Sequence, residues 1–289
     1  MPRPSTFSIA AFDPNVKAWG VAVASKFPAV GAVVPWVRAG SGAVATQSYA
    51  NTSYGPRGLE LMDSGMTAEQ ALERLLAEDE GRSQRQVGLI DMYGGAATFT
   101  GDSCHSWAGG RTGHHYAVQG NILTGERVID AMAGEFESAG GNLPQRLLTA
   151  LHAGDRAGGD RRGRQSAAIY VAREAAGYGG MNDRWIDYRV DDDLDPVPRL
   201  MELLQLHELY FGESEESQRL PIQGEVHDRL KAIVIAHAYL SAEAADDESA
   251  FIAVLDSFFG NENFEERSDA AAGWIDEPVY TYLLKKFES

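Results

Sequence analysis

The stretch TFSIAAFD, residues 6–13, is followed after a short turn by the stretch WGVAVASK, residues 19–26. Both stretches are rich in small, aromatic and β-branched residues, a composition typical of strands. The residues between them begin with Pro14 and Asn15, which favour turns. We therefore expect an antiparallel hairpin in which Thr6 opens the first strand and Ser25 and Lys26 close the second.

The register of this hairpin decides which side chain lies beside Thr6. If the turn centres near Asn15, Thr6 lies opposite Ala24, and Lys26 is its diagonal neighbour on the same face. A slip of one residue places Ser25 opposite Thr6 instead. In either register, a hydroxyl or an ammonium group is expected next to the Thr6 backbone.

A threonine in this position can hydrolyse amides if it is the first residue of the mature chain. Its hydroxyl would be the nucleophile and its own α-amine the general base. Lys26 would lower the pKa of that amine and keep it basic near neutral pH. Because residues 1–5 precede Thr6, this mechanism requires cleavage of the Ser5–Thr6 bond. The alternative is that Thr6 only opens a strand and Lys26 is a charge at a strand end.

Composition and charge restrict the class of protein. The 289 residues are 44% hydrophobic and carry a formal net charge of −17, which argues against nucleic acid and anionic membrane surfaces as partners. No apolar run approaches the roughly 18 residues that span a bilayer, and no secretory signal is visible, so we expect a cytoplasmic protein. Cys104 is the single cysteine, which excludes an internal disulfide.

Further strands and helices alternate along the chain up to residue 212. Strands are predicted at 30–36, 43–47, 86–92, 96–100, 116–119, 166–173 and 185–190, and helices at 54–62, 67–78, 124–138, 144–152 and 196–210. Thr67 and Gln70 form a capping-box pattern at one helix start. The acidic stretch 212–218 lacks apolar periodicity, so we place a domain boundary there. Residues 1–212 then form the main domain, and residues 219–289 form a small module of three helices.

A second candidate site is the stretch GGDRRGRQS, residues 158–166, which enters the strand at 166–173. The guanidinium groups of Arg161 and Arg164 suit a carboxylate or phosphate group of a substrate. Asp160 and Gln165 would line the same site. The alternatives are a solvated basic loop and internal pairing of the arginines with Asp160.

Two polar stretches could supply donors to a developing oxyanion. QSYANTSYG, residues 47–55, connects a predicted buried strand to a helix and contains Asn51 and Gln47, of which Gln47 is also expected to bind substrate. Asn121 has an equivalent place after the strand at 116–119. Side-chain amides in such positions can stabilise negative charge on a reacting oxygen. Ordinary turn and capping chemistry explains the same residues equally well.

The cysteine and the histidines suggest no metal or cofactor. Cys104 and His105 are neighbours in sequence, and neighbouring side chains on a strand point apart, so we expect Cys104 to be a small buried residue. The histidines show no HExxH or similar ligand spacing. We therefore expect a site without metal.

Several stretches together resemble the bacterial and archaeal family catalogued as domain of unknown function 1028, over about residues 6–212. The matching stretches are TFSI and the following A-x-D within 6–13, GVAVASKF (20–27), GAVVPW (31–36), YGPRGLEL (54–61), AVQGNIL (117–123) and GDRRGRQSAA (159–168). The resemblance implies an α+β fold similar to the four-layer αββα sandwich of N-terminal-nucleophile (Ntn) hydrolases. Residues 259–267 and 274–276 resemble a small appended domain described as peptidoglycan-binding.

The resemblance implies amide hydrolysis, and it assigns roles to the residues above. Thr6 is the expected nucleophile and base, tuned by Lys26, with Asn51 or Asn121 as oxyanion donor and Arg161 or Arg164 holding a substrate carboxylate. Ser25 is the next candidate nucleophile. The substrate would be a small or peptide-like amide, and the protein a homo-oligomer. The competing hypothesis is a non-catalytic binding or scaffold protein in which Thr6 stays blocked.

Overall fold

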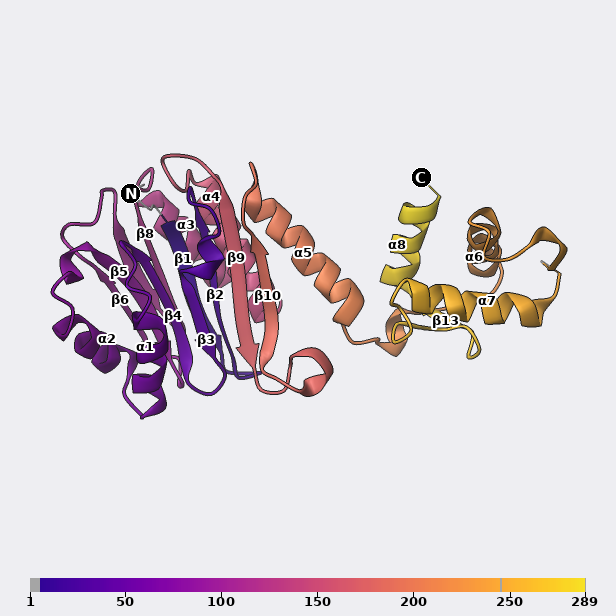
Figure 1. Cartoon of the computed structure of the whole chain (residues 1–289), viewed down its shortest axis with the longest axis horizontal. Helices are drawn as coiled ribbons and strands as arrows, with labels where there is room; N and C mark the ends of the chain where they lie inside the picture. Colours follow the sequence, from indigo (N-terminus) through magenta and orange to yellow (C-terminus); the bar gives the residue numbers. More distant parts are fainter. Residues whose placement is uncertain (1–5, 245, 289) are drawn as a thin grey trace. The chain divides into compact units, whose positions relative to one another are not determined.

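The computed structural model describes residues 6–244 and 246–288 of the chain. These residues form a mixed α/β architecture of antiparallel sheets and eight α-helices (Figure 1). The chain divides into two compact units, one up to Leu204 and one from Gln205, so the division falls within helix α5, Pro196–Phe211. No helix in the described part of the chain is long and apolar enough to cross a membrane.

The first unit is built around a six-stranded sheet in which all neighbouring strands run antiparallel. The expected hairpin of β1 and β2 lies in the middle of this sheet. The strand order is β10 (Arg184–Val190), β9 (Ser166–Arg173), β2 (Ala18–Ser25), β1 (Thr6–Asp13), β8 (Tyr116–Asn121) and β7 (Gly109–Gly113). Strand β7 is absent from the sequence prediction because its composition, GGRTG, carries no strand signal.

The first of the two expected hairpin registers is wrong, and the second is the one observed. Phe7 pairs with Ala24 and Asp13 with Ala18, so Thr6 lies at the level of Ser25 and not of Ala24. The reason is the turn, in which the backbone N–H of Asn15 donates to Asp13 Oδ1 and Lys17 adopts a positive φ of 51°. Four residues, 14–17, therefore separate the strands, and the turn centres after Asn15.

A second sheet of four antiparallel strands faces the first. Its order is β3 (Pro35–Arg38), β4 (Gly42–Ser48), β5 (Arg85–Asp91) and β6 (Ala96–Thr100). The strand predicted at 30–36 begins only at Pro35, because Val30–Ala32 form a 3-10 turn. Between β4 and β5 come α1 (Tyr54–Asp63) and α2 (Ala68–Ala77), and the predicted capping box at Thr67 is confirmed.

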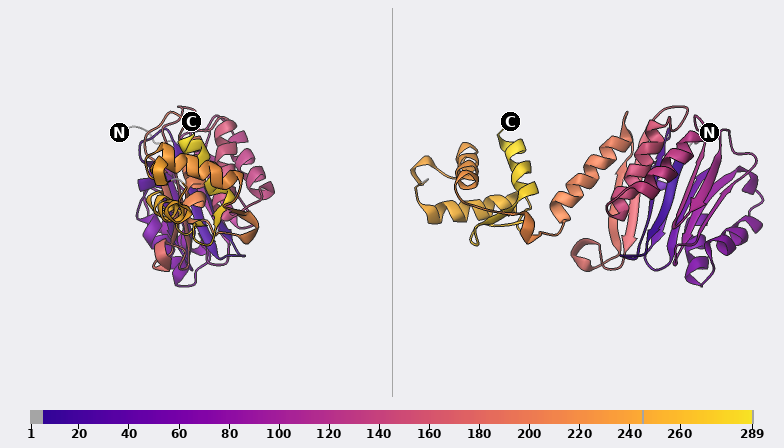
Figure 2. Two further views of the ribbon diagram at one scale, coloured as in Figure 1. Left: turned by 90° about the vertical axis from the view of Figure 1, so that its right-hand side faces the viewer. Right: turned by 180° about the vertical axis from the view of Figure 1, so that it is seen from behind.

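Alternating residues of β1 pack in two directions. Phe7 and Ile9 pack with residues of helices α3 (Arg127–Ser138) and α4 (Leu143–Arg156), and these helices lie over the six-stranded sheet in the view from behind (Figure 2, right). Ala10 and Phe12 instead pack with residues of the four-stranded sheet. Helices α1 and α2 form a further apolar cluster with β4 and β5, on the other side of that sheet. Thr6 therefore shares its face of β1 with the residues that lie between the sheets.

The second unit contains the last residues of α5, three short strands and three helices. The strands are β11 (Arg219–Pro221), β13 (Trp274–Asp276) and β12 (Ser268–Asp269), and the helices are α6 (Glu225–Ala236), α7 (Glu248–Asn261) and α8 (Glu277–Phe287). The buried Arg267 pairs with Asp276 and donates to the carbonyl oxygens of Glu208, Leu209 and Gly212. These bonds tie the end of α5 to the second unit, which explains why the division falls before the polar stretch 212–218.

Candidate functional site

Thr6 is buried between the two sheets, where it begins β1. Its residue surface is 2% exposed. The hydroxyl Oγ1 donates a hydrogen bond to Ser25 Oγ over 3.3 Å. Two hydroxyl groups from the central hairpin are therefore in direct contact at one end of the six-stranded sheet. The expected cleavage after Ser5 concerns residues 1–5, which lie outside the described residues.

The space between the sheets changes character along the strands. Near the turn of the hairpin it is filled by apolar residues such as Phe12, Val37 and Ile90. Around Thr6 the inward faces carry polar side chains, all at most 2% exposed: Thr6 and Ser8 from β1, Gln47 from β4, Gln86 from β5, and Gln119 and Asn121 from β8. Burial of these amides destabilises the fold unless each is hydrogen-bonded.

Gln47 connects Thr6 to both sheets. Its Nε2 lies 3.3 Å from the carbonyl oxygen of Thr6 and 2.8 Å from Gln86 Oε1. Its Oε1 accepts a hydrogen bond of 2.6 Å from Ser8 Oγ. Gln47, which we expect from the sequence to end the strand 43–47 and to bind substrate, lies within β4, and its amide bonds to neighbouring protein groups.

Asn121 approaches the same carbonyl from the six-stranded sheet. It is the pairing partner of Thr6 between β1 and β8. Its Nδ2 donates to Gln86 Oε1 over 2.9 Å and lies 3.5 Å from the carbonyl oxygen of Thr6. The amides of Gln47 and Asn121 thus converge on Thr6 from opposite sheets.

Sequence patterns indicated neither Gln86 nor two other members of this cluster, Ser8 and Gln119. Gln86 is fully buried, and its Oε1 accepts hydrogen bonds from both Gln47 and Asn121. The available signal was a glutamine at the start of the otherwise apolar stretch QVGLIDM, residues 86–92. A polar residue at a strand start is ordinarily read as an edge position, so pattern alone did not single it out.

Lys26 lies at the surface beside the loop 158–166. Its backbone N–H donates to Asp160 Oδ2 over 2.7 Å, and its Nζ donates to the carbonyl oxygen of Arg164 over 3.1 Å. The register that places Ser25 beside Thr6 turns Lys26 to the other face of the strand. Ser25, and not Lys26, is therefore the side chain that contacts Thr6.

The arginines of the loop 158–166 have different partners. Arg162 forms an ion pair with the buried carboxylate of Asp160, 3.0 Å away, which is the internal pairing considered from the sequence. Arg164 pairs with Asp155 at 2.8 Å and with Asp195 at 3.1 Å, and the bond to Asp155 raises the pKa of the Arg164 guanidinium. Gln165 bonds to a further acidic residue, Asp192.

Arg161 differs from its neighbours. Its side chain is exposed, and its guanidinium makes no hydrogen bond or ion pair with any residue in 6–244 or 246–288. Its backbone N–H donates to the carbonyl oxygen of Ile122, the residue after Asn121. Arg161 is therefore attached, through the backbone, to the strand end that carries Asn121.

A small hollow opens between Ser25 and this arginine loop. Its lining includes Ser25, Asp155, Arg164 and Ser166 together with the apolar Phe7 and Val197. Charged, hydroxyl and apolar side chains therefore line the same hollow. The hollow lies next to the residue that contacts Thr6.

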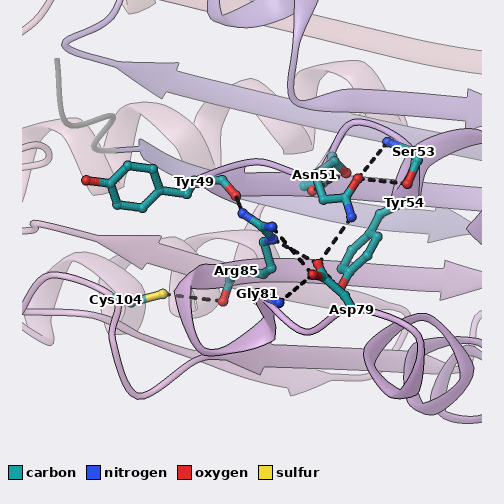
Figure 3. Close-up of polar contacts among 9 residues, drawn as sticks. Tyr49, Asn51, Ser53, Tyr54, Asp79, Gly81, Arg85 and Cys104 are labelled. Atoms are coloured by element: carbon teal, nitrogen blue, oxygen red, sulfur yellow. Dashed lines mark hydrogen bonds and ion pairs between the residues drawn. The ribbon is translucent and has the colours of Figure 1, made fainter. Parts of the chain in front are cut away.

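Asn51 belongs to a different polar cluster, centred on Asp79 (Figure 3). Asn51 Nδ2, Tyr54 Oη and Arg85 Nε donate to Asp79 Oδ2 over 3.1, 2.9 and 2.9 Å. Because Arg85 and Gln86 are neighbours on β5, their side chains lie on opposite faces of the sheet. The structure thus places Asn121 beside Thr6, whereas it places Asn51 on the outer, helix-covered face.

The Asp79 cluster is a satisfied structural centre. The guanidinium of Arg85 holds the pKa of the Asp79 carboxyl well below its usual range. Burial, followed by the hydrogen bond to Asp79, raises the pKa of the Tyr54 hydroxyl. Tyr54 is therefore a neutral donor at any physiological pH, and Asp79 is ionised. The cluster joins the end of β4, the start of α1 and the start of β5.

Cys104 and the acidic and histidine residues form no metal centre in the part of the chain that is described. Burial raises the pKa of the Cys104 thiol, which donates to the carbonyl oxygen of Arg85. Within residues 6–244 and 246–288, no group of three or more His, Cys, Asp or Glu side chains could hold a metal ion.

Fold and site together define a mixed α/β protein with a buried polar centre between two antiparallel sheets. The chain belongs to the family of unknown function DUF1028, whose model matches residues 6–200. It is similar to a DUF1028-family protein from Silicibacter pomeroyi of known crystal structure, at 28% identity and a TM-score of 0.64, over 78% of this chain and 93% of that one. No curated protein matches the chain.

Proposed function

We propose that the protein is an Ntn-type amidohydrolase with Thr6 as its nucleophile. In this proposal the two sheets and their helices are the four-layer αββα sandwich of that class. Removal of residues 1–5 would free the α-amine of Thr6. The hydroxyl would then attack a substrate amide carbonyl, while the amine accepts the hydroxyl proton and passes it to the departing amine. Water would hydrolyse the resulting ester and restore Thr6.

The observation that carries the proposal is the contact between Thr6 Oγ1 and Ser25 Oγ in a buried polar centre. Two further facts support it. The family match begins at Thr6 itself, so the first five residues lie outside the region shared with the family. Amide donors also converge on the Thr6 backbone from both sheets, as a pre-organised nucleophile requires.

The geometry also favours particular roles for the neighbouring residues. Asn121 is the better oxyanion donor, because Asn51 bonds to Asp79 on the other face of the sheet. Ser25 would orient the hydroxyl of Thr6. Arg161, the exposed cation at the same strand end, would bind a substrate carboxylate, since Arg164 is already neutralised by two aspartates. The substrate class is then a small or peptide-like amide with an anionic group.

Residues 1–5 would be removed by the same nucleophile, before its α-amine is free. The Thr6 hydroxyl would attack the carbonyl carbon of Ser5, and the acyl group would move from nitrogen to oxygen. Hydrolysis of that ester would release the five residues and leave the free amine of Thr6. Each step uses only the threonine and water.

The alternative is a non-catalytic binding or scaffold protein, and the near-complete burial of Thr6 favours it. Three other features stay predictions: a cytoplasmic location, a homo-oligomer, and a peptidoglycan-binding-like role for the second unit.

The test compares three proteins made to begin at residue 6, by protease cleavage of a fusion placed directly before it. These are the natural sequence, Thr6→Ala, and Thr46→Ala, in which another fully buried strand threonine is changed. Amine release is measured across a panel of carboxylate-bearing amides. Hydrolysis that is lost only in Thr6→Ala supports the proposal. Equal hydrolysis in Thr6→Ala would exclude Thr6 and move the search for a nucleophile to Ser25 or Cys104, whereas no hydrolysis in the natural sequence would favour the non-catalytic alternative.

A further inference from the structure

We propose that Gln86 is a positioning residue for this centre: it holds the amide of Asn121 with the NH2 group, and not the oxygen, toward Thr6. The inference rests on the proposed function, because the orientation of Asn121 affects catalysis only if Thr6 is the nucleophile. It concerns a residue that touches the nucleophile only through its neighbours.

The orientation of the Gln86 amide is set by two carbonyl oxygens, which can only accept hydrogen bonds, and by a hydroxyl group, which can donate or accept. Its Nε2 lies 2.8 Å from the carbonyl oxygen of Gly120 and 3.2 Å from that of Gly109. Carbonyl oxygens cannot donate, so the nitrogen of Gln86 must face them. The hydroxyl of Thr100, 2.8 Å away, accepts a further bond. The Oε1 of Gln86 consequently faces the other way.

That oxygen determines the orientation of two more amides. Gln86 Oε1 lies 2.9 Å from Asn121 Nδ2 and 2.8 Å from Gln47 Nε2. Because Oε1 can only accept, both residues must present their NH2 groups to it. A rotated Asn121 would place two acceptor oxygens against each other in a fully buried place, at the cost of an unmet hydrogen bond.

The second N–H of Asn121 is thereby directed at Thr6, whose carbonyl oxygen is 3.5 Å away. This long hydrogen bond turns the NH2 group toward the residue that would carry the acyl group. A donor in that place stabilises an oxyanion, whereas the amide oxygen would repel it. Gln86 therefore determines whether Asn121 attracts or repels an oxyanion formed at Thr6.

Gln119 provides a matched control within the same space. It is equally buried, and its amide bonds to Ser8 and Thr98. Gly88 leaves room for it, since a Cβ there would lie 2.1 Å from Gln119 Oε1. Replacing either glutamine by leucine removes buried hydrogen bonds, but only Gln86→Leu removes the acceptor that orients Asn121.

The experiment compares the natural sequence, Gln86→Leu and Gln119→Leu, all beginning at residue 6. A β-lactone probe acylates nucleophilic threonine, and intact mass follows the rate. Side-chain NH2 exchange of Asn121 is followed by NMR. We expect Gln86→Leu to slow acylation about tenfold or more and to abolish the protection of the Asn121 side-chain NH2 against exchange. In Gln119→Leu, the acylation rate and the exchange rate should both stay within about threefold of those of the natural sequence.

Three outcomes would contradict the role of Gln86 or the proposed function. Acylation of Gln86→Leu within about threefold of the natural rate, or unchanged protection of the Asn121 amide, overturns the role of Gln86. Absence of acylation in the natural sequence contradicts the proposed function instead, and the exchange measurement still decides the orientation of Asn121. If Gln86→Leu does not fold, Gln86→Glu replaces it: its protonated form can donate to Gly120 and accept from Asn121, so acylation should fall as this carboxyl ionises.

Discussion

The hydroxyl groups of Thr6 and Ser25 lie 3.3 Å apart, on adjacent central strands. The contact exists because the β1–β2 turn contains four residues and sets the register. Ser25 is therefore the residue through which the hairpin acts on the candidate nucleophile, and its removal is the first test of that contact.

Ser25→Ala should reduce hydrolysis by the chain that begins at residue 6, because the Thr6 hydroxyl loses the group that orients it. We expect a reduction of about tenfold, corresponding to about 1.4 kcal/mol in the activation barrier. The control is Ser41→Ala, another buried serine, which bonds to Asp63. Both variants should lose about 1 kcal/mol of stability. Equal kcat values for Ser25→Ala and Ser41→Ala would show that Ser25 stabilises the fold but does not orient the Thr6 hydroxyl.

Asn121→Ala and Asn51→Ala separate the two asparagines that the sequence could not rank. Asn121→Ala should lower kcat by about 100-fold, because it removes the donor beside Thr6. Asn51→Ala should leave kcat within about threefold and lower the urea midpoint, because it removes a bond to Asp79. Steady-state kinetics and urea unfolding measure both effects. The reverse pattern would move the oxyanion site to the loop 47–55.

Arg161→Ala should raise KM for a carboxylate-bearing amide about tenfold and leave kcat unchanged, since it removes uniform binding. For the same amide without its carboxylate, KM should not change. Arg74→Ala, which breaks a surface pair with Glu78 on α2, is the control. If KM for the two amides changes equally, Arg161 does not recognise the carboxylate.

Asp79→Asn should destabilise the first unit by about 3 kcal/mol at pH 7, because Arg85 is left without its ionised partner. The folded-state pKa of Asp79 is lowered relative to the unfolded chain. Its contribution is therefore fully present above the unfolded pKa of about 3.9 and is lost as pH falls below it toward the folded pKa.

Urea unfolding at pH 7, 5, 4 and 3 measures this dependence. The difference between the natural sequence and Asp79→Asn should be constant from pH 7 to 5 and shrink below about pH 4. Asp63→Asn, which affects an exposed carboxylate 3.8 Å from Arg38, should show little difference at any pH. A difference for Asp79 that does not vary with pH would contradict the assigned charge.

Local patterns in the sequence predicted the parts of the fold that depend on neighbouring residues. The central hairpin and the capping box at Thr67 are confirmed because each depends on a few adjacent side chains. The register of the hairpin could not be predicted, because it depends on the positive φ of Lys17, which hydrophobic patterning does not reveal. Strand β7 was missed because its glycine-rich sequence carries no hydrophobic alternation.

The candidate site was predictable only where one element supplies it. Thr6 and Ser25 belong to one hairpin, and the sequence could bring them together. Asn51 finds its partner 28 residues away in Asp79, and Gln86 contacts Asn121 35 residues away. Such long-range polar pairs have no local signature, so Asn51 was placed with Thr6 and Gln86 was overlooked.

The central claim is that Thr6 becomes the amino terminus and acts as nucleophile. The most direct measurement is the intact mass and N-terminal sequence of the purified full-length chain during incubation, beside the Thr6→Ala variant. We predict that the natural chain loses residues 1–5 and begins at Thr6, while the variant retains them. A natural chain that still begins at Met1 or Pro2, with no loss of residues 1–5, would contradict the claim.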